Sequence, residues 1–444
     1  MGRRRAAAVV LAGGLGARMR SDTPKHLHEI LGRRLIDWVL AAVDRLDADP
    51  VVLVTSPAAE SSLAGTLPPG VTMAVQPEPR GTGDALLRAR PFLGGTDRVV
   101  VVPGDTPLLT GALLADFASA YDESAHALVL SFEPDEPGAY GRVIRDDEGR
   151  MREIVEAGDA TAEQLSLTEV NSSIYLFSLP GLWDVLDATG TDNVQGELYL
   201  TDAVALLVES GRRVCAHVAS DASVLEGVNT RAELAAATAA LRDRILGAHL
   251  DAGVTIVDPA TTWVDADVTI EPDVVIQPFT VLRGTTAVGA AAQVGPHVVA
   301  IDATVGQRAT VGPFAYLRPG ADLGEGSKVG TFVEVKQSRI GRGTKGPHLS
   351  YIGDAEIGEG TNIGAGAITA NYRAELGGTK EKTRIGDNVH TGSHNVFVAP
   401  IEIGDGAYVG AGSTITKDVP PGALAVARSR QIVKEGYRGG RARE

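Results

Sequence analysis

A glycine-rich turn near the start of the chain has the residue types needed to hold phosphate groups. The run Leu11-Ala12-Gly13-Gly14-Leu15-Gly16-Ala17-Arg18-Met19 follows an apolar stretch, and Pro24-Lys25 comes shortly after it. Glycine allows the backbone to approach phosphate oxygens closely, and its N–H groups can bind them. Arg18 and Lys25 would neutralise the charge on a phosphate leaving group. Taken alone, such a turn is often only a strand-to-helix connection, and its spacing matches neither the Walker A loop nor GxGxxG.

Two other side chains stand where they could take part in chemistry. Asp105 lies in Gly104-Asp105-Thr106-Pro107-Leu108, directly after the apolar run at 99–102, and ligands of open α/β sheets collect at the carboxyl ends of strands. The histidines, His348 among them, could act as general bases because imidazole titrates near neutral pH, and only the motif around His348 sets it apart. A lone histidine is otherwise read as a surface or structural residue.

The N-terminal half alternates short apolar runs with helical stretches. Continuous apolar runs favour strands that are buried on both faces of a mostly parallel α/β sheet. The segment Thr230-Arg231-Ala232-Glu233 has the capping-box pattern and predicts a long helix over 231–249. Strands are expected at 7–11, 51–54, 98–102, 127–130 and 174–177.

After residue 250 aliphatic residues recur every six positions. Neither an α-helix nor an alternating strand has this period, whereas a hexapeptide β-helix does, because three short strands form each triangular coil. The phase slips near 335–340 and between 352 and 357, and it is lost over 367–384, which predicts a projecting loop. The residues in this pattern are Val264, Ile270, Ile276, Leu282, Val288, Val294, then Val305, Val311, Leu317, Leu323, Val329, Val335, then Ile385, Thr391, Phe397, Ile403, Val409 and Ile415.

Length and composition exclude several classes of protein. At 444 residues the chain should form two or three domains. A net charge of −15 without a basic block argues against nucleic-acid binding. Cys215 is the only cysteine, which excludes an intramolecular disulfide framework or a multi-cysteine metal site. No apolar run is long enough for a membrane span, and glycines and arginines interrupt any signal-like segment, so we expect a cytoplasmic protein.

The complete set of motifs resembles one family along essentially the whole chain. The turn and Lys25 are similar to the signature of sugar-1-phosphate nucleotidyltransferases. The later motifs resemble the bacterial bifunctional enzymes that are both N-acetylglucosamine-1-phosphate uridylyltransferase and glucosamine-1-phosphate N-acetyltransferase. These motifs are Gln76, Gly81-Thr82-Gly83, Tyr140-Gly141-Arg142, Ile154-Val155-Glu156, Glu169-Val170-Asn171, Glu226-Gly227-Val228-Asn229, Arg318-Pro319-Gly320, Phe332-Val333-Glu334-Val335-Lys336 and His348-Leu349-Ser350-Tyr351.

The resemblance implies a fold and an activity. Residues 1–229 would form a Rossmann-like α/β uridylyltransferase domain, 230–250 a linker helix, and 251–444 a left-handed parallel β-helix with acetyltransferase activity. Acetyl-CoA would acetylate glucosamine-1-phosphate, and the product would react with UTP and Mg²⁺ to give UDP-N-acetylglucosamine for peptidoglycan precursors. The flat faces of such prisms pack around threefold axes, so a homotrimer is implied.

The resemblance also implies a role for each matching residue. In the N-terminal domain Arg18 and Lys25 would be catalytic, and Asp105 with Asn229 would bind Mg²⁺. Leu11, Ala12, Gly13, Gly14, Lys25, Gln76, Gly81 and Thr82 would hold the nucleotide, and Gly141, Glu156, Asn171 and Asn229 the sugar phosphate, with Thr82 also near the sugar. In the β-helix His348 would be the base, Arg318, Lys336, Tyr351, Asn362 and Lys382 would hold glucosamine-1-phosphate, and Asn371, Tyr372, Ser393, Ala411 and Arg428 would contact acetyl-CoA.

The chain departs from the family pattern at Ala17, Arg80, Ser172-Ser173 and Pro347. Two other interpretations remain open from the residues alone. One is a nucleotidyltransferase whose β-helix serves only oligomerisation or regulation. The other is a catalytically silent binding scaffold, against which the joint presence of Lys25, Asp105 and Asn229 argues.

Overall fold

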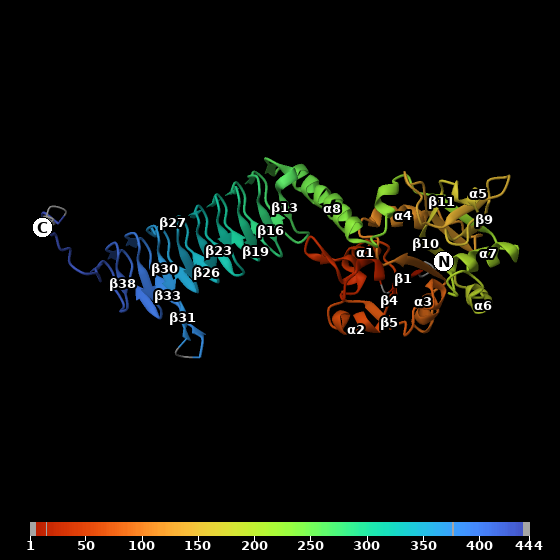
Figure 1. The fold of residues 1–444 in the computed structure, drawn as a ribbon, viewed down its shortest axis with the longest axis horizontal. Coiled ribbons are helices and arrows are strands. Elements are labelled where there is room, and N and C mark those ends of the chain that lie inside the picture. The colour runs from red at the N-terminus through yellow and green to blue at the C-terminus, as the bar shows by residue number, and fades with distance from the viewer. Residues whose placement is uncertain (1–5, 15, 375–376, 438–444) are drawn as a thin grey trace, which may run out of the picture. The chain divides into compact units, whose positions relative to one another are not determined.

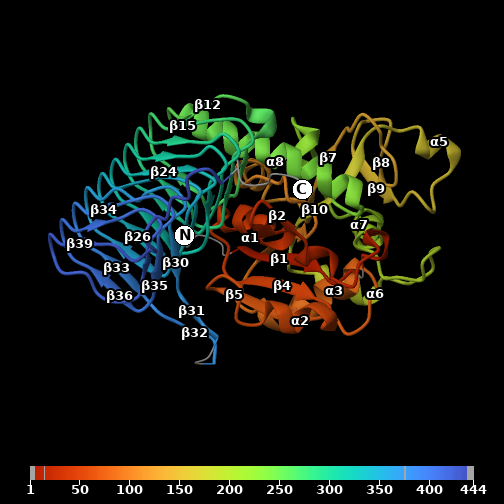
Figure 2. The same cartoon turned by 60° about the vertical axis from the view of Figure 1, so that its left-hand side comes forward.

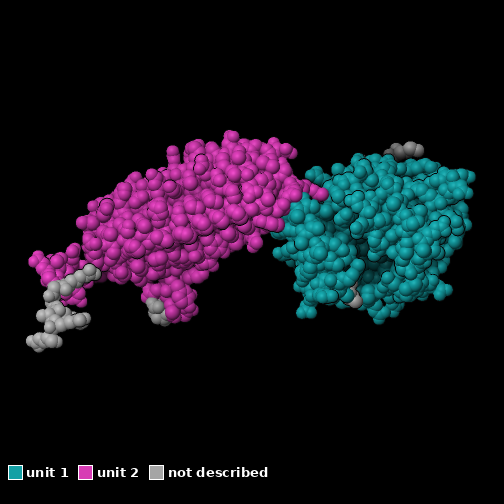
Figure 3. Space-filling view, turned by 45° about the horizontal axis from the view of Figure 1, so that its top comes forward, with its two compact units in different colours: residues 1–241 teal, residues 242–444 magenta. Residues whose placement is uncertain are grey.

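The computed structural model describes residues 6–14, 16–374 and 377–437. The chain divides into two compact units, residues 1–241 and 242–444, which Figure 3 colours separately. Each unit is described by itself below.

The first unit is built on a mixed nine-stranded sheet. Its main path runs in the order β11-β7-β10-β6-β1-β4-β5, and β10 is antiparallel to both of its neighbours. A ribbon of β8 (Arg142–Arg145) and β9 (Met151–Val155) pairs with the start of β10. The strands are β1 (Ala6–Ala12), β4 (Val51–Thr55), β5 (Val71–Val75), β6 (Arg98–Pro103), β7 (Ala127–Phe132), β10 (Val170–Ser178) and β11 (Val214–Val218).

Helices cover both faces of this sheet (Figure 1). Alternate residues of β1 enter different cores: Ala7 and Val9 pack on one side, and Ala8 and Val10 on the other. The first side is closed by α3 (Thr82–Ala89), α6 (Leu182–Ala188) and α7 (Leu200–Glu209), and the second by α1 (Leu35–Asp44), α2 (Pro57–Leu63) and α4 (Gly111–Ser119). This double burial explains the continuous apolar strands and confirms the predicted α/β class.

Helix α8 spans Arg231–Asp251, and the division between the units falls within it. Its start has the predicted capping box. The Glu233 backbone N–H donates to Thr230 Oγ1 at 3.2 Å, and the Glu233 carboxylate accepts from the Thr230 backbone N–H at 3.0 Å. The reciprocal bonds satisfy donors that the first helical turn leaves free.

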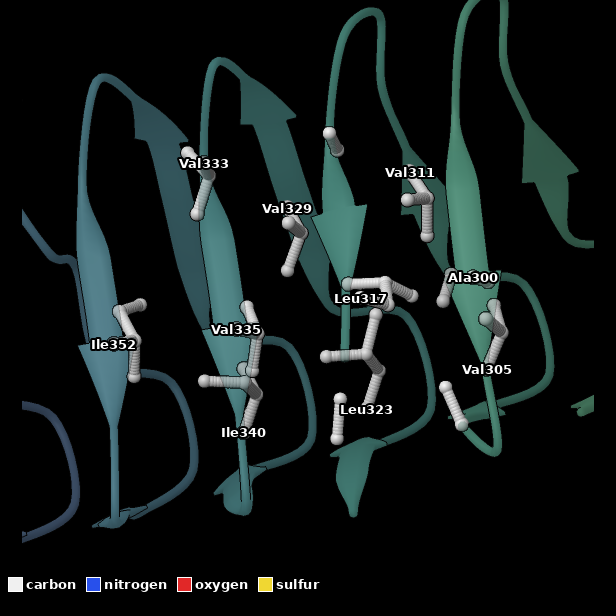
Figure 4. Close-up of a cluster of buried hydrophobic side chains, with 14 of the residues drawn as sticks. Ala300, Val305, Val311, Leu317, Leu323, Val329, Val333, Val335, Ile340 and Ile352 are labelled. Atoms are coloured by element: carbon white, nitrogen blue, oxygen red, sulfur yellow. The ribbon is translucent and has the colours of Figure 1, made fainter. Parts of the chain in front are cut away.

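The second unit is a parallel β-helix whose coils stack into three sheets. One sheet runs from β12 (Thr255–Ile256) to β27 (Lys345–His348), another from β13 (Trp263–Val264) to β38 (Thr414–Ile415), and the third from β14 (Thr269–Ile270) to β36 (Ile401–Ile403). A further sheet joins β34 (His390–Thr391), β37 (Tyr408–Val409) and β39 (Leu424–Ala425). All the residues of the six-residue pattern are buried, as Figure 4 shows for several of them.

The coils differ in length where the six-residue phase slips. Ile276 pairs with Val294, eighteen positions along, but Val294 pairs with Val311, only seventeen along. Ala300 lies in the interior between Leu282 and Leu317 in the same column, so the shortened coil keeps its core filled. Inward-facing aliphatic residues therefore carry the repeat, and a one-residue deletion is absorbed at a corner.

The predicted loop is an antiparallel ribbon that leaves the solenoid (Figures 1 and 2). It consists of β31 (Tyr372–Arg373) and β32 (Thr379–Lys380), inserted between β30 (Ile368–Ala370) and β33 (Thr383–Ile385). Among the described residues, no helix is long and apolar enough to span a membrane.

Candidate active sites in the two units

The first unit contains a cavity of about 700 Å³ at the carboxyl ends of β1 and β6. Gly13 and Gly14 follow β1, and Asp105 follows β6, so the sheet brings both predicted motifs to one edge. Leu11, Arg18, Lys25, Gln76, Gly81, Thr82, Glu156 and Asn229 also line the cavity. Ala12 is buried beside it, in the core under the turn.

Lys25, Asp105 and Asn229 meet at one point in this cavity. Lys25 Nζ forms an ion pair with Asp105 Oδ2 and donates to Asn229 Oδ1 at 2.9 Å. Arg18 Nη2 donates to the same amide oxygen at 3.1 Å. Asn229 is brought close because the Val228 backbone N–H donates to the Asp105 carbonyl at 2.8 Å. Residues separated by more than a hundred positions thus form one polar cluster.

The charges in this cluster are set by burial and by their neighbours. Burial would raise the pKa of Asp105, but the Lys25 ammonium and His26 leave that pKa below its usual value. Burial lowers the pKa of His26 to about 4, outweighing the attraction of Asp105. The carboxyl group is therefore an anion at neutral pH, and His26 is uncharged.

The oxygens of this cluster suit a hard divalent cation. Asp105 Oδ2 and Asn229 Oδ1 both contact a single ammonium nitrogen, so they converge on one cationic position. Within the described ranges, no group of three His, Cys, Asp or Glu residues could hold a metal ion. Two protein oxygens match Mg²⁺ better than zinc, since Mg²⁺ takes its other ligands from water and substrate phosphates.

Gln76 lines the cavity, and its position explains why residue 13 is a glycine. Its Nε2 donates to the Gly81 carbonyl at 3.1 Å and to Asp84 Oδ2 at 2.8 Å. Its Oε1 lies 2.3 Å from the point where a Cβ at Gly13 would stand. Any other residue at position 13 would displace this carboxamide, whereas a Cβ at Gly14 would meet nothing within 4 Å.

The sequence analysis missed a segment that completes the cavity wall. Gln195, Glu197, Tyr199 and Thr201 line the cavity, from the end of a loop into α7. The Leu198 carbonyl accepts from the Gly83 backbone N–H at 2.8 Å, and a Cβ at Gly81 would lie 2.4 Å from the same oxygen. Polar residues at alternate positions just before an apolar helix were the available signal, but no spacing connects them to a loop more than a hundred residues earlier.

The same segment orients two residues of the predicted sugar site. Thr82 Oγ1 accepts from the Leu200 backbone N–H at 3.1 Å. Thr201 donates to Glu156 Oε1 at 3.2 Å, and burial raises the pKa of Glu156.

Asn171 begins a bulge in β10 beside Gly141. Its backbone N–H donates to the Gly141 carbonyl at 2.9 Å, and its side chain donates to the Tyr175 hydroxyl at 2.7 Å. The register of β10 against β7 shifts between Asn171 and Ile174. Ser173, one of the departures from the family pattern, has φ of +61°, a conformation that favours glycine. The bulge places Ser172 and Ser173 on the cavity wall.

In the second unit a polar cluster forms where the projecting ribbon returns. Lys336 Nζ lies 3.7 Å from Asp354 Oδ2, and Asn371 Nδ2 bonds the same carboxylate and lies 3.4 Å from the Tyr351 hydroxyl. Lys380 brings a second ammonium against Lys336, and this contact lowers the pKa of Lys380. Two neighbouring lysines of this kind can bind an anion. The sequence analysis missed Asp354 and Lys380.

The other predicted sugar-phosphate residues lie around this cluster to different extents. Arg318 follows β22 (Tyr316–Leu317), next to β25 (Glu334–Lys336), and its guanidinium bonds Glu334 at 2.8 Å. Lys382 is paired with Glu356 at 2.7 Å instead of joining Lys336. Asn362 lies in the column of Lys345 and His390, on another sheet.

His348 ends β27 with an exposed side chain, one coil along from Thr331. The backbone around it is fixed, since its carbonyl accepts from Ser350 Oγ at 2.8 Å. Pro347, preceding it, packs its carbonyl 2.0 Å from the point where a Cβ at Gly330 would stand.

The predicted acetyl-CoA residues lie on successive coils. The Gly412 backbone N–H donates to the Ser393 carbonyl at 2.8 Å, and Ala411 packs on Gly392. The Arg428 side chain comes 3.9 Å from a Cβ built at Gly412. Ser393, Ala411 and Arg428 therefore gather at one corner. Tyr372 is exposed on the projecting ribbon, and Asn371 belongs to the Lys336 cluster.

These features define a nucleotidyltransferase unit joined to a hexapeptide-repeat transferase unit. Residues 8–168 match the MobA-like NTP transferase domain, and residues 382–417 match the bacterial transferase hexapeptide. The chain belongs to the family of bifunctional GlmU proteins. It is 48% identical to the bifunctional protein GlmU of Streptomyces coelicolor over 98% of this chain and 94% of that protein. It is 47% identical to the bifunctional protein GlmU of Thermobifida fusca over 98% of this chain and 94% of that protein. It is 44% identical to that of Mycobacterium tuberculosis over 96% of this chain and 90% of that protein.

Proposed function

We infer that the chain catalyses two consecutive reactions in the synthesis of UDP-N-acetylglucosamine. It acetylates glucosamine-1-phosphate with acetyl-CoA and then transfers UMP from UTP to N-acetylglucosamine-1-phosphate, releasing pyrophosphate. Membership of a bifunctional family along nearly the whole chain supports this function over a single-activity nucleotidyltransferase or a silent scaffold. The observation that carries the first site is the convergence of Lys25, Asp105 and Asn229 in the cavity.

In the uridylyltransferase reaction a phosphate oxygen of the sugar phosphate attacks the α-phosphorus of UTP. The bond from that phosphorus to the bridging oxygen breaks, and pyrophosphate leaves. Both reactants are anions, so the chain must offset repulsion and align them, and no protein nucleophile is needed. Arg18 and Lys25 are proposed to hold the phosphates. Asp105 and Asn229 would hold Mg²⁺, which supplies charge neutralisation when bound.

The remaining predicted residues, in the cavity or beside it, are proposed to bind and orient the two substrates. Leu11 to Gly14, Gln76 and Gly81 would hold the nucleotide. Thr82, Gly141, Glu156 and Asn171 would hold the sugar, a role supported for Glu156 by its half-buried position beside Thr201. We add Tyr199 and Thr201 to this set because both line the same cavity.

In the acetyltransferase reaction the substrate amine attacks the thioester carbonyl, the carbon–sulfur bond breaks, and CoA leaves with a proton. The amine must first lose a proton, and His348 is proposed as its acceptor. Lys336 and Lys380, with Arg318 and Tyr351, are proposed to hold the phosphate and sugar. The adjacent ammonium groups of Lys336 and Lys380 support this proposal. Ser393, Ala411 and Arg428 would contact acetyl-CoA.

We also propose a homotrimer and a cytoplasmic location. Exposed rings form a stacked ladder on the β-helix, in which Phe279, His297 and Phe314 follow one another with centroids 4.7 and 4.6 Å apart, and Phe332 continues it. An exposed apolar row of this kind is typical of an interface. Light scattering should give about three times the 46.1 kDa chain mass, and a monomer would contradict the trimer.

The decisive experiment measures the two reactions separately. Purified protein would receive glucosamine-1-phosphate with acetyl-CoA, or N-acetylglucosamine-1-phosphate with UTP and Mg²⁺. Asp105→Asn should abolish pyrophosphate release and leave CoA release unchanged, and His348→Asn should do the reverse. Release of pyrophosphate but no CoA by the wild-type protein would overturn the second activity.

A further inference from the structure

We propose that Asp84 is a positioning residue that selects uracil by fixing the orientation of the Gln76 carboxamide. This inference rests on the proposed uridylyltransferase function of the cavity. It concerns which base the cavity accepts, and it assigns a role to a residue outside every motif used above.

The position of Gln76 between two acceptors determines how its carboxamide is turned. Gly81 offers a carbonyl oxygen at 3.1 Å and Asp84 a carboxylate oxygen at 2.8 Å, and both face Nε2. Only the NH₂ branch of the amide can donate, so rotating the group would place an oxygen against two oxygens. Oε1 must therefore point the other way, against Gly13 on the cavity wall. No described residue is seen to donate to Oε1, which leaves it available to a ligand.

Asp84 is held as an acceptor by its surroundings. It is the third residue of α3, where the helix N-terminus favours a negative charge. Arg88 Nη2 donates to its other oxygen, Oδ1, at 2.9 Å. The Asp84 side chain is only 12% exposed, so water competes little for the bond to Gln76.

A carbonyl oxygen that is fixed as an acceptor distinguishes the two common pyrimidines. The ring nitrogen N3 of uracil carries a hydrogen and can donate to Oε1, whereas N3 of cytosine carries a lone pair and would repel it. A carboxamide turned the other way would have the opposite preference. Specificity of this kind is large when the protein group is fixed and buried, because the wrong base leaves it unpaired.

The test compares UTP with CTP as substrates of the full-length protein. The ratio of kcat/KM for UTP to that for CTP would be measured by pyrophosphate release in the wild type, Asp84→Asn and Arg88→Gln. An asparagine at 84 can donate or accept, so only the Gly81 carbonyl would still oppose the turned carboxamide. We expect Asp84→Asn to lower the ratio about tenfold, mainly through a higher KM for UTP, with KM for the sugar phosphate unchanged. Arg88→Gln removes the partner of Asp84 Oδ1 but leaves the carboxylate oxygen that faces Gln76, so it should keep the wild-type ratio.

A second measurement needs no variant. UTP methylated at N3 lacks the donor that Oε1 requires, so the wild-type protein should use it at least about a hundredfold less well than UTP. Equal use of this analogue, or a wild-type ratio in folded Asp84→Asn, would overturn the role of Asp84. If the wild-type protein released no pyrophosphate from UTP at all, the proposed function itself would fail, and this inference with it.

Discussion

Single atoms decide the roles of several residues in the cavity of the first unit. Gly13 belongs to a run that favours phosphate binding on sequence grounds, but the structure gives it a different constraint. Its missing side chain leaves space for Gln76 Oε1, which would lie 2.3 Å from a Cβ there. Gly14, its neighbour in the same run, has open space at the corresponding point.

This contrast predicts different outcomes for two similar substitutions. Gly13→Ala should raise KM for UTP about tenfold, because the carboxamide must leave its hydrogen-bonded position. Gly14→Ala leaves the Gln76 carboxamide in place, so it should raise KM for UTP less than Gly13→Ala and serves as the matched comparison. Steady-state pyrophosphate release measures both, and equal effects would contradict the steric explanation.

The proposed anion site of the β-helix provides another matched pair. Lys380 lies against Lys336, whereas Lys382 is paired with Glu356. Lys380→Met should raise KM for glucosamine-1-phosphate at least about tenfold, because a charge-assisted contact to phosphate is lost, and Lys382→Met should have a much smaller effect. Acetyl-CoA consumption at varied sugar phosphate measures the difference. A larger effect of Lys382→Met would show that Lys382, as the resemblance implied, holds the sugar phosphate.

At the scale of elements, the sequence predicts what depends on local period and misses what depends on distant contacts. The six-residue period predicted the β-helix because it identifies each inward-facing residue from the sequence alone. Lys380 and Lys382 are two positions apart and have identical side chains. They have different partners only because of the path that the chain takes from β32 back to the solenoid. The segment with Glu197, Tyr199 and Thr201 joins the cavity through the Leu198 contact with Gly83, which no local pattern encodes.

Close stacking of coils makes some glycines indispensable. A Cβ at Gly330 would lie 2.0 Å from the Pro347 carbonyl on the next coil, whereas one at Gly346 would meet its nearest atom at 3.5 Å. Gly330→Ala should therefore destabilise the β-helix by roughly 1–3 kcal/mol and displace His348, reducing CoA release about tenfold, while Gly346→Ala changes neither. Thermal unfolding and the CoA release assay test this pair of variants. A Gly330→Ala protein with wild-type stability and wild-type CoA release would contradict the prediction.

At the scale of the whole molecule, the two units have separate cores, so their stabilities should respond separately to pH. His26 belongs to the first unit, and its folded pKa of about 4 lies below the 6.5 of an unperturbed histidine. Between these values the unfolded chain binds a proton that the folded chain does not. The contribution of neutral His26 is therefore complete above pH 6.5 and is lost as pH falls towards 4.

Lowering the pH from 7 to 5 should thus reduce the stability of the first unit by roughly 2 kcal/mol through this residue. His26→Gln should remove that part of the pH dependence. Urea unfolding, followed by a probe in the first unit at both pH values, compares the two proteins. Identical pH slopes for wild type and variant would show that His26 is not the group responsible.

The pairing of each coil with the next has a consequence for how such a chain can change in evolution. Each coil forms the same kind of hydrogen bonds with the coil before it and with the coil after it. Duplication of one whole coil, such as one of 17 or 18 residues, would therefore add a coil without altering the others. The unit would grow by about 4.8 Å per coil. A duplication of only part of a coil would turn the downstream interior residues to the surface. Internal duplications should therefore be tolerated in this half only when they add whole coils, so its length should change by whole coils.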